Sequence, residues 1–158
     1  MAQRLVNPLD YFAIQNVISR YCVALDSKEF ERLAEVFTTD VDATYPFPGG
    51  DLKGIEALES KIRARLGKVV TQHALTTQII TFNDDGKSAS AETYFTGSHF
   101  GHGAFEGQVI TAYGKYMDQL VCCEGAAPGM PGASGLWLIK KREVRFMKRI
   151  GDEGIMQK

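Results

Sequence analysis

Residues 71–100, TQHALTTQIITFNDDGKSASAETYFTGSHF, give the clearest indication of the architecture of this chain. The first part of this stretch is rich in the β-branched residues that favour strands. The segment NDDGK at 83–87 is a strong reverse-turn signal. The returning segment then alternates, with one side formed by Ala89, Ala91, Thr93, Phe95, Gly97 and His99. The stretch therefore predicts a long β-hairpin.

Helical periodicity dominates the residues that precede this hairpin. Asn7 followed by Pro8 is a favourable cap and first helical residue. The apolar residues that follow recur at spacings of three and four, at Tyr11, Ile14, Ile18, Tyr21 and Leu25. Ser27 is a candidate cap for a second helix, and the segment at 54–68 predicts a third helix that ends at Gly67. A short strand is expected between them, VDATYPF at 41–47.

Two more long strands are expected after the hairpin, at 107–123 and 135–148, with a loop of small and polar residues between them. Helices followed by a run of hairpin-connected strands indicate an α+β fold rather than an alternating one. We expect a single domain over 1–158, a cone-shaped barrel in which three N-terminal helices pack on a strongly curved antiparallel sheet. The space between helices and sheet is expected to form a concave, mostly apolar pocket for a small ligand.

The composition limits the classes of function. The chain has 158 residues, of which 44% are apolar and 23% charged, and its net charge is −1. This balance argues against nucleic acid as a partner, and no apolar run is long enough to span a membrane. Residues 1–12 lack the apolar core of a signal peptide, so a cytoplasmic protein is expected. The cysteines have neither disulfide-framework nor zinc-ribbon spacing, at Cys22, Cys122 and Cys123.

Asp26 lies where the apolar stripe of the first helix ends, in SRYCVALDSKEF at 19–30. An aspartate at a helix–turn junction commonly starts a turn and faces water. Asp26 also lies one turn after Cys22, on the edge of the buried face, where a carboxylate can reach the mouth of a pocket. The helix pattern alone leaves both interpretations open.

His73 favours the second interpretation. It lies in a strand of mostly apolar and threonine residues, with Leu75, Thr77 and Ile79 on its side. A histidine on such a face is often a core residue with one hydrogen-bond partner. An aspartate–histidine pair is, however, what proton abstraction beside a carbonyl requires, because the carboxylate fixes the imidazole tautomer and stabilises its protonated form. We therefore pair Asp26 with His73 as a candidate catalytic dyad.

His99 ends the strand that the turn pairs with the His73 strand. Cross-strand neighbours come within about 5–8 Å, so two imidazoles are expected to face one ligand. His102 follows in a Gly-rich link and is treated as peripheral. A three-histidine metal site is an alternative, but no carboxylate or cysteine completes the set, so no metal is expected.

Several segments together resemble a known family. These are YCVALDSKEFERLAEVFTTDV at 21–41, GIEAL at 54–58, TQHALTT at 71–77, SHF at 98–100 and LWLIKKREVRFMKRIGD at 136–152. They are similar to the SnoaL-like and scytalone dehydratase-like enzymes of the nuclear transport factor 2 superfamily, over nearly the whole chain. The pattern is also similar to that of bile acid 7α-dehydratases and of hexachlorocyclohexane dehydrochlorinases.

The resemblance implies a set of site residues. The scytalone dehydratase-like pocket has an aspartate, a tyrosine and two histidines, which match Asp26, Tyr45, His73 and His99. The 7α-dehydratase pattern adds a tyrosine of the first helix and an arginine of the last strand, which match Tyr21 and Arg145. By period two, Arg145 is expected on the inner side of its strand with Trp137 and Ile139, and Lys140 and Arg142 are expected outside.

The resemblance implies cofactor-independent elimination, in which a dehydratase removes water from a small apolar cyclic substrate, a hydroxy-ketone-type secondary metabolite or a steroid-like molecule. His73 acts as base, Tyr45 with Tyr21 or Arg145 hydrogen-bonds the enolate oxygen, and His99 protonates the departing hydroxyl. Isomerisation and polyketide cyclisation begin with the same proton removal and stay open.

A domain without catalysis, which binds a small ligand or a partner protein, is the alternative from another class. In that case Asp26 and His73 are not expected within hydrogen-bond distance. A homo-oligomer is expected in either case, a trimer or a dimer, because the last strands carry enough apolar residues to be covered.

Overall fold

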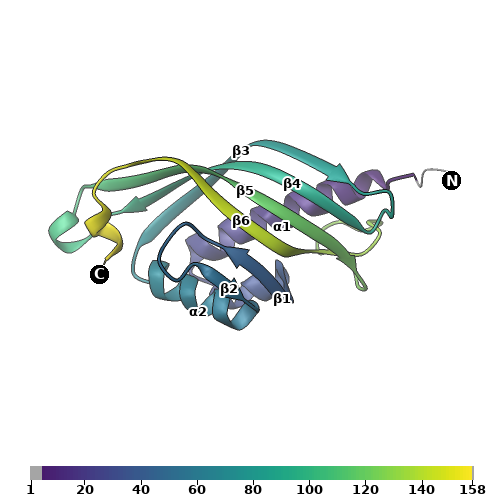
Figure 1. The fold of residues 1–158 in the computed structure, drawn as a ribbon, viewed down its shortest axis with the longest axis horizontal. Helices are drawn as coiled ribbons and strands as arrows, with labels where there is room; N and C mark the ends of the chain where they lie inside the picture. Colours follow the sequence, from purple (N-terminus) through teal and green to yellow (C-terminus); the bar gives the residue numbers. More distant parts are fainter. Residues whose placement is uncertain (1–4, 158) are drawn as a thin grey trace.

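The structure is a computed structural model that describes residues 5–157. Residues 1–4, which belong to the segment considered for a signal peptide, and residue 158 lie outside the described residues. In chain order the elements are α1 (Pro8–Ser27), the 3-10 helix η1 (Phe30–Glu35), β1 (Phe37–Thr44), β2 (Asp51–Lys53), α2 (Ile55–Leu66), β3 (Val70–Phe82), β4 (Ser88–Phe100), η2 (Gly103–Phe105), β5 (Val109–Cys123), β6 (Leu136–Ile150) and η3 (Glu153–Met156). Figure 1 shows the long strands β3 to β6 running side by side, with α2, β1 and β2 gathered at one side.

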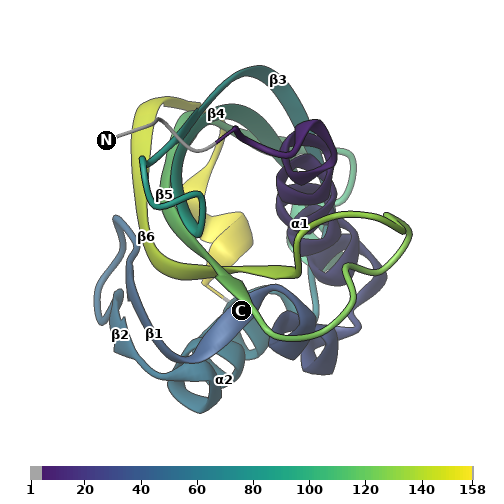
Figure 2. The same cartoon turned by 90° about the vertical axis from the view of Figure 1, so that its right-hand side faces the viewer.

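The six strands form one curved sheet in the order β2-β1-β6-β5-β4-β3. The predicted hairpin is present as β3 and β4, with Thr71 opposite His99, and the β4–β5 and β5–β6 pairs are also antiparallel. β1 runs parallel to β6, so the sheet is mixed rather than antiparallel throughout, and it is not closed into a barrel. Figure 2 shows the long strands curving around α1, which confirms the α+β architecture with helices on a strongly curved sheet.

α1 begins as the sequence predicts and ends later. The Asn7 side chain accepts a hydrogen bond from the Leu9 N–H at 3.0 Å, and Pro8 is the first helical residue. Ser27 still belongs to α1, and the helix ends at Lys28, which has a left-handed φ of 62°. The predicted Ser27 cap is therefore wrong, and the second helix is the short η1, which has no side-chain cap.

β6 contains an irregularity that changes which residues face the core. Ile139 points inward as predicted, but Lys140 is an extra residue, because Ile139 and Lys141 pair with adjacent residues of β5. One extra residue moves the side chains that follow it to the opposite face of a strand, here until a second irregularity between Phe146 and Lys148 restores the phase. Arg142 is consequently 1% exposed, and Arg145 is exposed. The predicted outward position of Arg142 and inward position of Arg145 are both wrong.

The core lies between the concave face of the sheet and the helices α1, η1 and α2. The apolar stripe of α1 is buried against it, at Ile14, Ile18, Tyr21 and Leu25. Burial of apolar area on this scale, at about 25 cal/mol per Å², is the main force that holds the helices to the sheet. The core therefore places the end of α1 beside β3.

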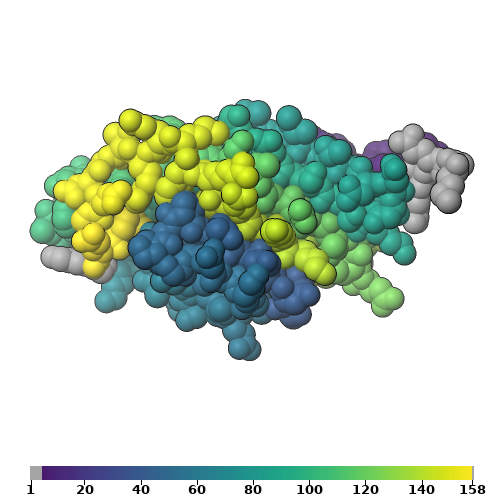
Figure 3. Space-filling model, in the orientation of Figure 1, coloured from purple at the N-terminus to yellow at the C-terminus, as the bar shows by residue number. Residues whose placement is uncertain are grey.

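The surface view shows β6 lying beside the segment that contains β1, β2 and α2 (Figure 3), as the β1–β6 pairing requires. α2 contacts β1, β2 and η1, so it packs on this end of the sheet. Within residues 5–157, no helix has the length and apolar character needed to cross a membrane.

Candidate active site

Asp26 and His73 are in direct contact. Asp26 Oδ1 lies 2.7 Å from His73 Nδ1, and Asp26 Oδ2 accepts the backbone N–H of His73 at 2.8 Å. Thr71 Oγ1 also donates to Asp26 Oδ1 at 2.8 Å. The carboxylate therefore faces the sheet instead of starting a solvated turn, and its side chain is 23% exposed.

The end of α1 and the start of β3 hold this contact in place. Asp26 lies in the last turn of α1, and the left-handed Lys28 then redirects the chain away from the helix axis. The Lys28 ammonium donates to Thr71 Oγ1 at 3.1 Å, so it supports the hydroxyl that bonds to Asp26. Three hydrogen bonds to one carboxylate leave it little freedom to rotate.

The hydrogen bonds set the charge state of Asp26. Burial by itself raises the pKa of this carboxyl, but the side-chain and backbone bonds from His73, the charge of His73 and the bond from Thr71 outweigh it. The pKa of Asp26 is therefore lowered from its ordinary value, and the side chain is a carboxylate at neutral pH. An ionised Asp26 keeps a proton on His73 Nδ1 and leaves the lone pair on Nε2.

His99 lies beside His73 on the concave face. The two rings are 5.9 Å apart between centroids and nearly perpendicular. Burial is the largest cause that lowers the pKa of His99 to about 4, and the charges of His73, Arg149 and Arg65 lower it further. His99 is thus a neutral imidazole at physiological pH.

These histidines border a cavity between the sheet and the helices. The cavity has a volume of about 70 Å³. The lining is mostly apolar and aromatic and comprises Tyr21, Leu25, Tyr45, Phe47, Ile62, Arg65, Leu66, His73, Phe95, His99, Ala112, Tyr116, Val144, Phe146, Arg149 and Met156. This combination of an apolar wall with a few convergent polar groups is typical of small-molecule sites.

Two tyrosine hydroxyls meet in the cavity wall. Tyr21 and Tyr45 are both buried, and their hydroxyl oxygens are 2.9 Å apart. Burial raises the pKa of Tyr45 and raises that of Tyr21 well above 10, so both hydroxyls keep their protons. One of the two is free to donate a hydrogen bond outward, because a pair of hydroxyls uses only one proton for its own bond.

Arg142 is the site residue that sequence reasoning missed. Its guanidinium is fully buried and bonds to Asp118 through two contacts of 2.7 Å. Burial by itself lowers the pKa of Arg142, but Asp118 holds it well above its usual range. The guanidinium carbon lies 4.3 Å from the Tyr21 ring centroid and 4.0 Å from that of Tyr116. The charge of Arg142 also lowers the pKa of Tyr45 against the effect of burial.

Asp118 is the residue from which this pair could have been predicted. It lies between Tyr116 and Leu120 on the inward side of β5, where an unpaired carboxylate is costly. The residue opposite Asp118 in the β5–β6 register is Arg142. A buried acid on one strand therefore indicates a buried base on its neighbour.

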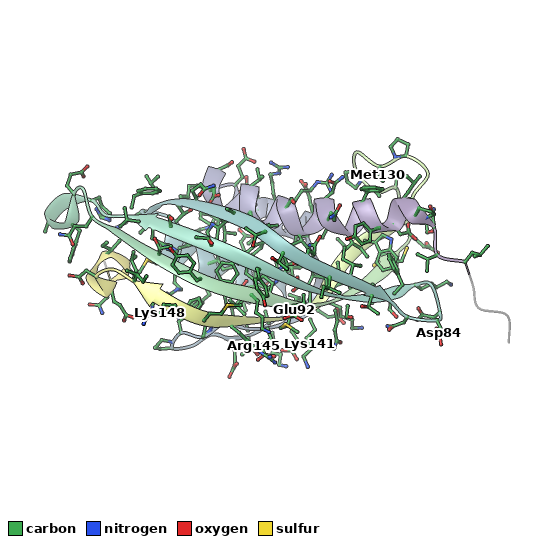
Figure 4. The ribbon with its side chains drawn as sticks, turned by 90° about the horizontal axis from the view of Figure 1, so that it is seen from above. Asp84, Glu92, Met130, Lys141, Arg145 and Lys148 are labelled. Atoms are coloured by element: carbon green, nitrogen blue, oxygen red, sulfur yellow. The ribbon has the colours of Figure 1, made fainter. Side chains whose placement is uncertain are left out.

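Arg145 is not at the cavity. It lies on the outer face of the sheet, where it pairs with Glu143 through contacts of 2.8 and 2.9 Å. Figure 4 shows Arg145 and Lys141 on the side of the sheet away from α1. The structure thus brings together Asp26, His73, His99, Tyr21 and Tyr45 and leaves Arg145 outside. Across residues 5–157, no three His, Cys, Asp or Glu side chains are grouped to hold a metal ion.

Solved structures with the same fold cover most of the chain. A protein from Novosphingobium aromaticivorans, provisionally named a scytalone dehydratase, is 22% identical with a TM-score of 0.74, over 92% of this chain and 89% of that chain. A type 2 hexachlorocyclohexane dehydrochlorinase is 18% identical with a TM-score of 0.75, over 92% and 90%. Another N. aromaticivorans protein, provisionally named an aromatic ring hydroxylase, is 20% identical with a TM-score of 0.77, over 96% and 99%. At these identities the similarity establishes the fold alone.

The sequence comparison is more specific. Among curated proteins, no significant match is found. Residues 8–143 match the family described as the SnoaL-like domain, and the matched range spans the Asp26–His73 contact. This chain therefore belongs to the SnoaL-like domain family.

Proposed function

We propose that this protein is a cofactor-independent dehydratase that removes water from a cyclic hydroxy ketone. The observation that carries the proposal is the 2.7 Å contact between Asp26 and His73 at the wall of an apolar cavity. The contact places a histidine with an ionised carboxylate partner beside the cavity, which favours catalysis over binding alone. The names of two neighbours with the same fold, a scytalone dehydratase and a dehydrochlorinase, agree with elimination chemistry.

His73 is the base in this proposal. With Nδ1–H donated to Asp26, its Nε2 removes the proton from the carbon next to the substrate carbonyl. Gly97 lies opposite His73 on β4, and a Cβ there would be 3.3 Å from Nε2. The absence of a side chain at Gly97 therefore leaves this nitrogen room to approach a substrate.

The tyrosine pair stabilises the enolate. As the proton leaves, negative charge develops on the carbonyl oxygen, and the Tyr21–Tyr45 pair donates a hydrogen bond to it. Arg142 supports this bond by placing a positive charge over the Tyr21 ring. One well-placed donor of this kind is worth about 3–4 kcal/mol in the barrier.

The hydroxyl leaves in the second half of the reaction. The enolate electron pair forms the new C=C bond, the C–O bond breaks, and the hydroxyl takes a proton to become water. Because the pKa of His99 is about 4, His99 is a poor source of that proton at neutral pH. We assign the proton to protonated His73, which returns the one it removed, and we assign to His99 the orientation of the leaving hydroxyl by hydrogen bonding.

A panel of cyclic β-hydroxy ketones tests the proposal, with the conjugated product followed by its ultraviolet absorbance. We expect His73→Ala to abolish turnover while the thermal unfolding curve stays close to that of the unchanged protein. His102→Ala is the matched control, because His102 is exposed in the β4–β5 connection. Equal rates for His73→Ala and the unchanged protein would remove the mechanism. A product of unchanged mass would identify isomerisation or cyclisation instead of dehydration.

A further inference from the structure

Two arginines occupy the half-buried part of the cavity lining. Arg65 belongs to the last turn of α2 and Arg149 to the end of β6, and both line the same cavity as His73 and His99. Neither residue has a part in the proposed proton transfer. Their position raises the question of which substrate group they meet.

Aromatic rings of the cavity wall hold both guanidinium groups. The Arg65 guanidinium carbon lies 3.8 Å from the Phe47 ring centroid, and that of Arg149 lies 5.2 Å from the Phe146 centroid. Stacking of this kind restricts a guanidinium without using its N–H donors. Stacking therefore leaves the edge donors of Arg65, and those of Arg149 other than the Nη1 that bonds to Glu153, available for a ligand.

The charges of the lining do not balance. No carboxylate belongs to the lining, and among the described residues Arg65 takes part in no ion pair. Arg149 has one carboxylate partner, Glu153 of η3, at 2.9 Å, while its Nε is buried without a hydrogen-bond partner. Arg65, Arg149 and Glu153 together carry one net positive charge, while the Asp26 carboxylate is already bonded to His73.

The neighbouring groups respond to this excess charge. Burial and then the charge of Arg149 lower the pKa of Arg65. The charges of both arginines also contribute to the lowered pKa of His99, after burial and His73. A single bound anion would relieve these repulsions and would satisfy the free N–H donors, because guanidinium groups bind carboxylates through paired hydrogen bonds.

We infer that Arg65 and Arg149 bind a carboxylate of the substrate, so that the substrate class is a cyclic hydroxy ketone that carries one carboxylate. This inference rests on the proposed function for the ring chemistry, but the anion site itself is independent of His73. One net positive charge matches a carboxylate better than a doubly charged phosphate. The carboxylate also fixes which carbon of the ring faces His73, as distant binding groups do in other enzymes.

Binding of two matched probes tests the inference. Cyclohexanecarboxylate and cyclohexanecarboxamide have nearly the same shape and differ in charge, and calorimetric titration gives the Kd of each. We expect the carboxylate to bind at least about tenfold more tightly than the amide, as charge-assisted bonds require. Arg65→Gln and Arg149→Gln are each expected to reduce this preference to about twofold or less. Arg65→Lys is expected to keep part of it, because the charge remains.

Two arginines elsewhere on the same elements provide matched controls. Arg63 lies on α2 but pairs with Glu59 at the surface, and Arg145 lies on β6 but pairs with Glu143 on the outer face. The control variants are Arg63→Gln and Arg145→Gln. Both controls are expected to keep the preference of the unchanged protein. Equal binding of the two probes, no detectable binding of the carboxylate, or a loss of preference in the controls as large as in the test variants would overturn the inference.

The same titration separates this inference from the proposed reaction. His73→Ala is expected to keep the carboxylate preference, because it does not change the anion site. If the preference is present but no hydroxy ketone is turned over, dehydration fails and the anion site stands. If hydroxy ketones are turned over but the carboxylate gives no advantage in binding, the anion site fails and dehydration stands.

Discussion

Gly97 illustrates how one missing side chain shapes the site. A Cβ at this position would lie 3.2 Å from His73 Cδ2 and 3.3 Å from Nε2, closer than most real Cβ contacts. The imidazole of His73 would have to shift by a few tenths of an ångström, while Asp26 holds its other edge. Gly97 is therefore a positioning residue for His73.

We expect Gly97→Ala to lower kcat about tenfold with a small change in thermal stability, because displacement of a reacting group is costly for the rate. Steady-state kinetics and thermal melting measure the two effects. A histidine-specific NMR signal of His73 provides the readout that a merely structural role would not move. An unchanged kcat together with an unchanged His73 signal would contradict this role.

Asp26→Asn tests the role of the carboxylate in the same way. The amide keeps the size of the side chain but no longer favours the Nδ1–H tautomer of His73, so kcat is expected to fall about 10³–10⁴-fold. The lowered pKa of Asp26 adds a stability effect. Its stabilising contribution is complete above the unfolded pKa of about 3.9 and is lost as the pH falls through the lower folded value.

The stability difference between the unchanged protein and Asp26→Asn should therefore shrink as the pH falls below about 4. Urea unfolding at a series of pH values measures it. A difference that grows on acidification would show that the folded pKa of Asp26 is raised instead of lowered.

His99 gives a pH dependence at a higher range. Its pKa of about 4 in the folded protein lies below the unfolded value, so the unfolded chain binds more protons between the two values. Stability is therefore expected to fall by about 2 kcal/mol between pH 7 and pH 5 through this residue. His99→Gln should remove that slope, and His102→Gln should keep it. Urea unfolding at both pH values makes the comparison.

At the scale of elements, the parts that sequence reasoning predicted are those with local causes. The cap and apolar stripe of α1 and the β3–β4 hairpin follow from spacing and turn residues. The Asp26–His73 contact followed from the chemistry that the two side chains share. The parallel β1–β6 pair and the three-residue β2 depend on contacts between distant segments, which periodicity does not report.

The bulge in β6 is the clearest example of a feature that the alternation of apolar and polar residues does not predict. Two consecutive exposed lysines, Lys140 and Lys141, break the alternation of inward and outward residues. The sequence alone does not say whether the residues after them continue the earlier alternation or are shifted by one. Alternation extended from Trp137 places Arg142 outside and Arg145 inside, the reverse of their positions in the structure. Only the buried Asp118, which lies opposite Arg142, could have indicated which residues after the lysines face inward.

The Arg142–Asp118 pair joins β5 and β6 inside the core. Arg142→Met is expected to destabilise the protein by about 3–5 kcal/mol, because it leaves the Asp118 carboxylate buried without a partner. Adding Asp118→Leu to this variant should recover part of the loss, since the double variant buries no charge. Chemical denaturation of the single and double variants measures the coupling. If the double variant loses more free energy of unfolding than the two single variants lose together, this account is contradicted.

At the scale of the whole molecule, the outer face of the sheet carries apolar side chains that no other part of residues 5–157 covers. These are Ile79, Tyr94, Tyr113 and Met147, which are 62%, 37%, 42% and 52% exposed. The expected position of Ile79 on the side of His73 is wrong, because an irregularity in β3 between Leu75 and Gln78 changes the face of the residues after it. The predicted homo-oligomer would bury these apolar side chains, as exposed apolar patches commonly mark interfaces. Polar residues share this face, since Glu92 lies opposite Ile79 in the β3–β4 register and Arg145 pairs with Glu143 on the outer side (Figure 4).

Light scattering after size-exclusion chromatography tests this prediction. We expect a mass of two or three chains for the unchanged protein and a smaller mass for Ile79→Asp, because a buried unpaired charge opposes association. Val23→Asp is the control, since Val23 is half-exposed on α1, away from the sheet face. A monomer at micromolar concentration would show that the face is not an interface between copies.

Asp26 also forms a hydrogen bond at the open edge of the sheet. β3 is an edge strand, so its outward backbone N–H groups have no neighbouring strand, and an edge of this length invites addition of a strand from another molecule. Asp26 Oδ2 accepts a hydrogen bond from one of these groups, the His73 N–H. The carboxylate that bonds to His73 therefore also makes the β3 edge less available for intermolecular β-pairing. We expect Asp26→Ala to aggregate more readily on storage than Asp26→Asn, which retains an acceptor.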